Sequence, residues 1–285
     1  MLKADITLTF KTMLSLSSQH IIDLYVLVDD TIPKISRPRG GRPATLSESE
    51  LITILVWNQL AVKQKTLKDV HRWLLLYHRK EFPHIPKYNA FLDHCHRIAP
   101  LLHQLLTQLL CTNAQLRFMD STMIPVCKLA RADNHKTALG IAQFGKNHQG
   151  WHYGFKLHAS IDPKGRLCGI ALTPANVYDA QMIPKILNED TKIAVGDSHY
   201  GASVMRQYIW ETYGTIIIAP PHFKQKKKVM TAWQHLLLAM RPKIESVFDY
   251  LKEHLHFVSS FPRSVKGYLL HYLRILLGYQ VLMLG

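Results

Sequence analysis

Acidic residues are scarce in this sequence of 285 residues, which contains 20 Asp and Glu against 35 Lys and Arg. The formal net charge is therefore +15, and the pI is near 9.7. So large an excess of positive charge repels itself in a compact protein unless a polyanion neutralises it. The scarcity of acidic residues thus favours a nucleic acid as the partner, ahead of an acidic membrane surface or no polyanion at all.

Cysteine is also scarce, and no two of the four cysteines form a Cys-x-x-Cys pair. This excludes a disulfide-dense scaffold and predicts reduced, mostly buried thiols. The N-terminus lacks the pattern of a secretory signal, because acidic residues interrupt its apolar stretches. We therefore expect a cytoplasmic protein.

Long apolar runs are missing as well. The strongest membrane candidate, residues 268–284, is shorter than the roughly 20 residues that span a bilayer, and it contains His271, Arg274 and Gln280. We expect a buried terminal helix there. The hydrophobic share of 47% and the charged share of 19% indicate a folded protein with a real core rather than a disordered chain.

The first part of the chain is helical in texture. Ser47-x-x-Glu50 before a run of apolar residues is a capping-box pattern that begins a helix. Periodicity predicts further helices over residues 14–28, 66–77, 88–98 and 100–110. We therefore expect a small all-α, DNA-binding domain over residues 1–113, in which a helix-turn-helix is compatible with the pattern but is not required by it.

A break rich in proline and glycine separates the first two of these helices. It carries several cations, among them Arg37, Arg39 and Arg42. Such a segment suits an arm that lies along phosphates or in a minor groove. A solvated linker is an equally good interpretation of the same residues.

After residue 113 the pattern changes from helical to β. The sequence predicts strands over 115–126, 153–161, 166–172, 192–197 and 215–219, with a type I turn at Asp162-Pro163-Lys164-Gly165. Helices are expected over 179–187, 201–213 and from 231 to the end. This order predicts an α/β domain over residues 114–285, with an RNase H-like mixed sheet and flanking helices.

Asp120 stands in the middle of the first strand, where a buried strand would have another apolar residue. A buried carboxylate is costly unless a cation or a metal ion neutralises it. Asp197 ends a strand that would pair with the first, and ligands collect at the carboxyl ends of such strands. A third carboxylate is expected from Glu245, because its helical spacing from Arg241 and Lys252 places the three on nearly one face.

Three carboxylates in a strongly basic protein suggest phosphoryl transfer on DNA. Mg²⁺ takes oxygen ligands, and two ions roughly 3.5–4 Å apart need one bridging carboxylate and one more for each ion. We therefore expect Asp120, Asp197 and Glu245 to be catalytic and to bind two Mg²⁺, with Mn²⁺ as the alternative ion. Arg241 and Lys252 would then hold phosphates beside the metals.

Five segments in this order resemble the DDE transposases of bacterial insertion sequences, and they are most similar to the IS982 family within the IS4-like group. They are Asp120-Ser121-Thr122-Met123-Ile124-Pro125-Val126, Tyr153-Gly154-Phe155-Lys156-Leu157-His158, Thr173-Pro174-Ala175-Asn176 with Asp179, Gly196-Asp197-Ser198-His199-Tyr200, and Arg241-x-x-x-Glu245 with Lys252.

The resemblance implies a transposase that nicks double-stranded DNA at the terminal inverted repeats of its element. The freed 3′-hydroxyl would then attack target DNA, with Mg²⁺ held by Asp120, Asp197 and Glu245. Because transposition pairs two ends, a homodimer on DNA is expected. A basic loop contains Lys224, Lys226, Lys227 and Lys228. Such a run is usually a solvated loop, but beside a DNA cleft it would contact phosphates.

The sequence departs from this family at three positions. Leu238 stands where a tyrosine is usual, His199 precedes Tyr200 in place of glycine, and Pro242 suits the first position of a helix, which would put Arg241 at its cap. Two alternatives therefore stay open: an RNase H-like nuclease or resolvase without strand transfer, and a catalytically inactive relative that binds DNA.

Each carboxylate also has a purely structural interpretation. Asp120 could pair with Arg117 or Lys128, Asp197 could cap the following helix, and Glu245 could pair with Lys252. Other acids compete with Glu245 for the third position; they are Glu211, Asp249 and Glu253.

Overall fold

The structure is a computed structural model that describes residues 18–32, 44–147, 149–221 and 229–284. The chain divides into two compact units. One contains residues 1–109, 254–257 and 261–285, and the other contains residues 110–253 and 258–260. The sequence had placed residues 114–285 in a single domain, whereas the C-terminal helix groups with the N-terminal helices.

The helical unit is built as the sequence patterns predicted, with bounds shifted by a few residues. Its elements are α2 (Ser18–Thr31), α3 (Glu48–Trp57), η1 (Asn58–Val62), α4 (Leu67–Tyr77), α5 (Tyr88–Arg97), α6 (Ala99–Leu109) and α11 (Val265–Leu284). The capping box is confirmed: Ser47 accepts the Glu50 N–H, and the Glu50 carboxylate accepts the Ser47 N–H. These bonds satisfy donors that a helix start leaves unpaired.

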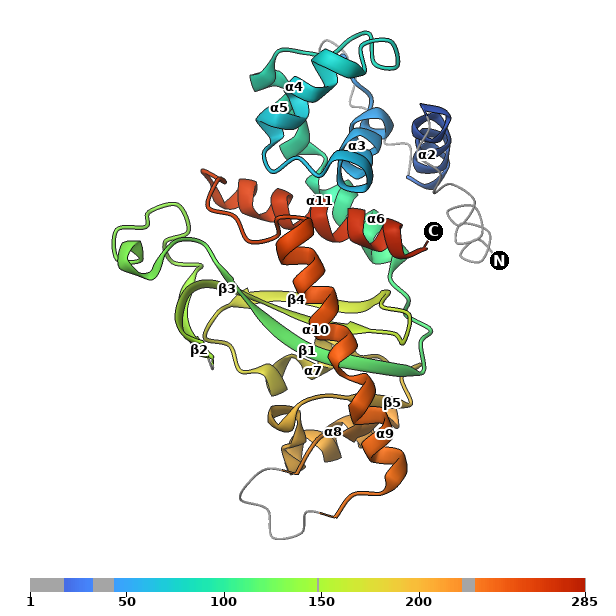
Figure 1. The fold of residues 1–285 in the computed structure, drawn as a ribbon, viewed down its shortest axis with the longest axis vertical. Coiled ribbons are helices and arrows are strands. Elements are labelled where there is room, and N and C mark those ends of the chain that lie inside the picture. Colours follow the sequence, from blue (N-terminus) through green and yellow to red (C-terminus); the bar gives the residue numbers. More distant parts are fainter. Residues whose placement is uncertain (1–17, 33–43, 148, 222–228, 285) are drawn as a thin grey trace. The chain divides into compact units, whose positions relative to one another are not determined.

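Helix α11 is the buried terminal helix that we expected, and it packs against α6, α3 and α5 (Figure 1). Gly278 allows α11 to pack closely on η1 as well, since a Cβ there would stand 2.4 Å from the Cβ of Gln59. Gln280 donates to the Leu109 carbonyl, so its polar group is paired inside the core. Among the described residues, no helix is both long enough and apolar enough to cross a membrane.

The second unit contains a mixed sheet in the order β2-β3-β1-β5-β6, with β4 also paired to β3. Its strands are β1 (Leu116–Pro125), β2 (Gln143–Asn147), β3 (Gly150–Ile161), β4 (Leu167–Pro174), β5 (Ile193–Val195) and β6 (Ile216–Ile218). Strand β1 is central, antiparallel to β3 and parallel to β5. The mixed sheet is the fold class that we predicted, although β2 was not foreseen.

The hairpin between β3 and β4 closes as the turn residues predicted. The Gly165 N–H donates to the Asp162 carbonyl at 2.9 Å, and Gly165 adopts φ +92°, which glycine tolerates well. The Asp162 carboxylate also binds the Arg166 side chain. Strand register in this hairpin is therefore fixed by local chemistry.

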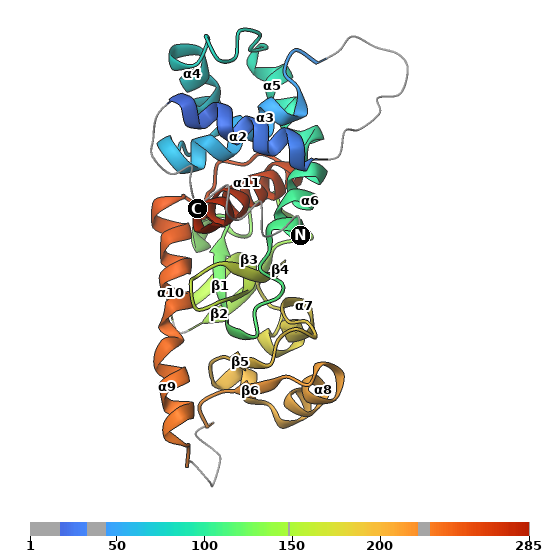
Figure 2. The same cartoon turned by 90° about the vertical axis from the view of Figure 1, so that its right-hand side faces the viewer.

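Helices cover both faces of the sheet, as Figure 2 shows, with α9 and α10 on one side and α7 and α8 on the other. The helices and helical turns between β1 and α11 are η2 (Leu129–Arg131), η3 (Asp179–Met182), α7 (Ile183–Ile186), η4 (Ser198–Gly201), α8 (Ser203–Tyr213), α9 (Ala232–Met240), α10 (Pro242–Asp249) and η5 (Tyr250–His254). The helix predicted over 179–187 is thus a 3₁₀ turn followed by a single α-turn that has Pro184 near its start.

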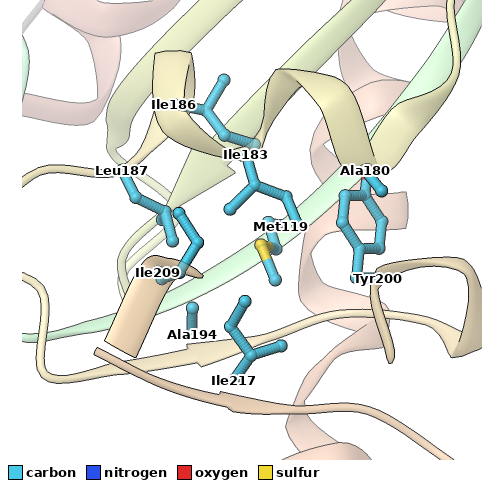
Figure 3. Packing of buried hydrophobic residues seen from close by; sticks show 9 residues of the cluster. All are labelled: Met119, Ala180, Ile183, Ile186, Leu187, Ala194, Tyr200, Ile209 and Ile217. Carbon is cyan, nitrogen blue, oxygen red and sulfur yellow. The ribbon is translucent and has the colours of Figure 1, made fainter. Parts of the chain in front are cut away.

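An apolar cluster lies between the sheet and the α7–α8 side (Figure 3). Met119 of β1 reaches into it, beside Ile183, Ile217 and Tyr200. Burying each large side chain contributes about 1.5–3 kcal/mol, so this cluster holds β1, β5 and the η4 turn together. Because side chains alternate along a strand, Asp120 points to the opposite face, where α10 packs on β1.

Candidate active site

Asp120 lies on β1 as a largely buried carboxylate. Its Oδ1 accepts the Ser121 N–H at 2.8 Å, and its Oδ2 accepts from Nη1 of Arg241 at 2.9 Å. The pKa of Asp120 is raised from 3.8 to about 6, chiefly by burial and to a smaller extent by the charges of Asp197 and Glu245, while the Ser121 N–H and Arg241 oppose the rise. A buried carboxylate in need of a cation is what the sequence predicted, and the cation in this structure is Arg241.

Arg241 stands at the junction of two helices. It ends α9 and caps α10, and Pro242 takes the first position of α10, as we predicted. Its guanidinium donates to Asp120 through Nη1 and to Oε1 of Glu245 through Nη2. One planar cation therefore bridges two carboxylates that are far apart in the sequence.

Asp197 follows β5, which pairs in parallel with β1. Val195 is the register partner of Phe118, so Asp197 and Asp120 each come two residues after a paired position. Neighbouring strands lie about 4.8 Å apart, and the charge of Asp197 accordingly helps to raise the pKa of Asp120. The pairing of these two strands was predicted from the sequence, and it places both aspartates at one edge of the site.

His199 binds both oxygens of Asp197. The His199 N–H donates to Oδ1, and Nδ1 of its ring lies 2.9 Å from Oδ2. This hydrogen bond raises the pKa of His199. Asp197 thus caps the η4 turn, which is the structural role that the sequence left open for it.

Two of the rival assignments, Glu211 as the third acid and Arg117 as the partner of Asp120, have other partners in the structure. Glu211 accepts from Gln207 on α8. Arg117 does not pair with Asp120 either, because its guanidinium donates to the carbonyls of Ala114, Ile186 and Thr112. Among the acids considered for the third position, Glu245 is the one that shares a partner with Asp120.

Lys252 does not lie on the regular helix that the spacing assumed. Helix α10 ends at Asp249, and Lys252 falls in the π-helical turn η5, where the α-helical repeat no longer holds. Burial lowers its pKa. The other predicted DNA contacts lie outside the described residues; they are Arg37, Arg39, Arg42, Lys224, Lys226, Lys227 and Lys228.

A polar cluster on β3 was not assigned a role from the sequence. Nζ of Lys156 donates to Asp179 at 3.0 Å and to the Val177 carbonyl at 2.9 Å. His158, which is fully buried, lies 3.5 Å from the same carboxylate, and burial lowers its pKa to about 4. The alternation of Lys156 and His158 along the strand was the available signal. This cluster fixes the η3 turn to the sheet. The η3 turn also contacts η4, which Asp197 caps.

The donor atoms of the site are of the kind that a magnesium ion takes. Asp120, Asp197 and Glu245 offer carboxylate oxygens, the ligands that Mg²⁺ prefers. Within the described ranges, no three His, Cys, Asp or Glu side chains stand close enough together to hold a metal. The guanidinium of Arg241 is the cation between Asp120 and Glu245 in this structure. The carboxylate oxygens therefore fit Mg²⁺ once that guanidinium is released.

The candidate site therefore consists of Asp120 in the middle of the central strand, Asp197 just after its parallel neighbour, and Glu245 on a helix. Arg241 pairs with two of these three carboxylates. A family of known proteins matches the same region. The sequence model of the transposase DDE domain covers residues 110–265, more than half of the chain. The chain therefore belongs to the transposase DDE domain family, whose members are enzymes that act on DNA.

Proposed function

We propose that this protein is the transposase of an insertion sequence and catalyses metal-dependent phosphoryl transfer. It nicks DNA at the ends of its element and joins the freed 3′-hydroxyl to target DNA. The observation that carries the proposal is the bridge that Arg241 makes between two acids from distant parts of the chain, with a third acid nearby. Asp120 and Glu245 share one guanidinium, and Asp197 is close enough to perturb the ionisation of Asp120.

In this proposal Asp120, Asp197 and Glu245 hold Mg²⁺, or Mn²⁺ in its place. When bound, the metal supplies charge neutralisation at the scissile phosphate and activation of the attacking oxygen. The protein's own residues prepare the site. Arg241 keeps Asp120 ionised by opposing the effect of its burial, and the Lys156–Asp179 pair supports the fold beneath the η4 turn.

Arg241 then changes partners. In the absence of DNA, its guanidinium faces two carboxylates. A phosphate of DNA is an equally good bidentate acceptor. Release of the carboxylates would free them for metal ligation while the arginine binds the DNA backbone. Lys252 and the lysines of residues 224–228 would add further phosphate contacts.

We further propose membership of the IS982 family, action as a homodimer that pairs two element ends in the cytoplasm, and DNA binding by the helical unit. The net charge of +15 supports the last of these.

A second candidate is a relative that binds DNA without cleaving it. It is favoured by His199, which takes both oxygens of Asp197 and stands where the family usually has glycine. Catalysis then requires that this pair opens.

The test is Mg²⁺-dependent nicking of a duplex that contains the ends of the element flanking the gene. Asp120→Ala and Asp197→Ala should abolish nicking and leave DNA binding in place. Glu211→Gln removes an exposed acid on α8 and is the matched control, expected to cleave normally. Retention of cleavage by both aspartate variants would contradict the mechanism, and no cleavage by the wild type with normal DNA binding would favour the inactive relative.

A further inference from the structure

The helical unit contains a cavity of about 180 Å³ that the proposed function does not use. It lies between the start of α4, the helix α5, and the beginning of α11 with the segment before it. One water needs roughly 10–15 Å³ of such space, so the cavity has room for a larger group. Its described lining contains the cations Lys65, Arg263 and Arg274 and no acidic side chain.

Arg274 is the unusual member of this lining because it is 1% exposed and lacks a carboxylate partner among its hydrogen bonds. Nη2 donates to the Lys65 carbonyl at 2.8 Å and to Nδ1 of His271 at 3.3 Å. Nη1 is 3.5 Å from the Gln64 carbonyl, and Nε has no hydrogen-bond partner in the described structure. Buried arginines are usually paired with an anion.

The neighbours of Arg274 do not neutralise it. Nε2 of His271 donates to the His256 carbonyl, so Nδ1 accepts from Arg274 and the ring is neutral. Burial lowers the pKa of His271 to about 3, in accord with this tautomer. Burial also raises the pKa of the Cys95 thiol to about 12 and lowers that of Arg274 to about 10, so the thiol is neutral and the guanidinium is charged at neutral pH.

Two helices begin at the wall of this cavity, and the positive ends of their dipoles add to the charge of the arginine. Thr66 caps α4, and its hydroxyl binds Asp69 in the first turn, so this helix end is already partly matched by an acid. Helix α11 follows Ser264, whose hydroxyl accepts the Gly267 N–H, and it has no acid in its first turn. The N-terminus of a 20-residue helix and an uncompensated arginine therefore meet at one cavity.

We propose that this cavity is an anion site that binds one phosphate of the DNA backbone. Arg274 supplies the buried charge, Lys65 and Arg263 are the exposed cations at the cavity, and the start of α11 supplies backbone N–H donors. The choice of DNA as the source of the phosphate rests on the proposed function. The site would give the helical unit a fixed phosphate contact, in addition to its general positive charge.

The test measures binding of the full chain to a duplex of about 30 base pairs as a function of salt. Loss of one phosphate contact lowers the slope of log K against log salt by roughly 0.9. Lys65→Gln combined with Arg263→Gln should show this decrease, and both side chains are exposed, so the fold should survive. The matched control is Lys68→Gln with Arg72→Gln, which removes two exposed cations of α4 that do not line the cavity.

A second measurement tests the anion site without DNA. Inorganic phosphate should raise the Tm of the wild type and of the control more than it raises the Tm of the Lys65→Gln, Arg263→Gln variant. Because phosphate also stabilises proteins non-specifically, the difference between variants is what counts. At about five times the Kd for phosphate, the expected excess is roughly 2–4 °C.

The proposal requires both results. Equal Tm rises in all three proteins would show that the cavity binds no anion. Equal salt slopes for the wild type and the cavity variant would show that DNA does not use it. Either result leaves the proposed function standing, whereas a wild type that neither binds nor cleaves DNA would overturn the proposed function itself.

Discussion

Replacing Asp120 by asparagine should stabilise the isolated protein at neutral pH. The pKa of Asp120 is raised by burial from 3.8 to about 6 in the folded protein. An acid with a raised pKa binds its proton more tightly when folded, so ionising it costs stability. The cost is absent below pH 3.8, grows as the pH rises towards 6, and is complete above that value.

The size of this cost follows from the shift. A difference of about two pKa units corresponds to about 3 kcal/mol at 1.36 kcal/mol per unit, which is an upper figure because asparagine also loses the charged hydrogen bond from Arg241. Asp120→Asn should therefore raise the free energy of unfolding by one to about 3 kcal/mol at pH 7. The gain should shrink to near zero by about pH 4.

The assay is urea denaturation of both proteins from pH 4 to pH 8 in the presence of EDTA. Adding Mg²⁺ should then stabilise the wild type and not Asp120→Asn, since a ligand stabilises the state that binds it. Glu211→Gln, on the exposed face of α8, should follow the wild type throughout. A variant that is less stable than the wild type at pH 7, or a gain that does not vary with pH, would refute the reasoning about a buried, under-neutralised carboxylate.

Three further changes test the frame around the site. Ile183→Ala, in the apolar cluster, should cost about 2–5 kcal/mol in urea denaturation, and a cost under about 1 kcal/mol would argue against that packing. Gly169→Ala should lower the Tm, because a Cβ there would stand 2.2 Å from the Ile186 carbonyl oxygen; an unchanged Tm would contradict this contact. His199→Ala should leave the unfolding free energy within about 1 kcal/mol, since its pair with Asp197 is exposed. Because the pKa of His199 is raised, the stability that the His199–Asp197 pair contributes should be present below about pH 6.5 and lost at higher pH. An effect of His199→Ala that does not vary with pH would count against the pair.

Local patterns predicted most of the elements because local chemistry fixes them. The capping box at Ser47 and the turn at Asp162 formed as expected, since both depend on residues three or four positions apart. Strand β2 escaped prediction because its five residues have no clear alternation, and it is defined by pairing with β3. The helix over 179–187 was shortened to single turns by Pro184 and by packing.

The acids proposed for the site could be named from the sequence, whereas the contacts that these acids make could not. Asp120 was identifiable because a carboxylate interrupts an apolar strand, and Asp197 because it ends one. The bridge through Arg241 joins atoms 121 residues apart along the chain. The sequence could suggest that Asp120 needs a cation, but it favoured a metal ion and offered Arg117 or Lys128 as the structural alternative.

The sequence by itself determined the basic charge, the alternating and helical patterns, and the acids that the proposed phosphoryl-transfer site requires. The tertiary structure decided which cation neutralises Asp120, that Lys252 lies on a π-turn, and that α11 packs with the N-terminal helices. It also decided the setting of Arg274, which the sequence shows as a charge within an apolar helix. The reason is physical: periodicity and turn chemistry act over a few residues, whereas burial and charge pairing depend on segments that meet only after folding.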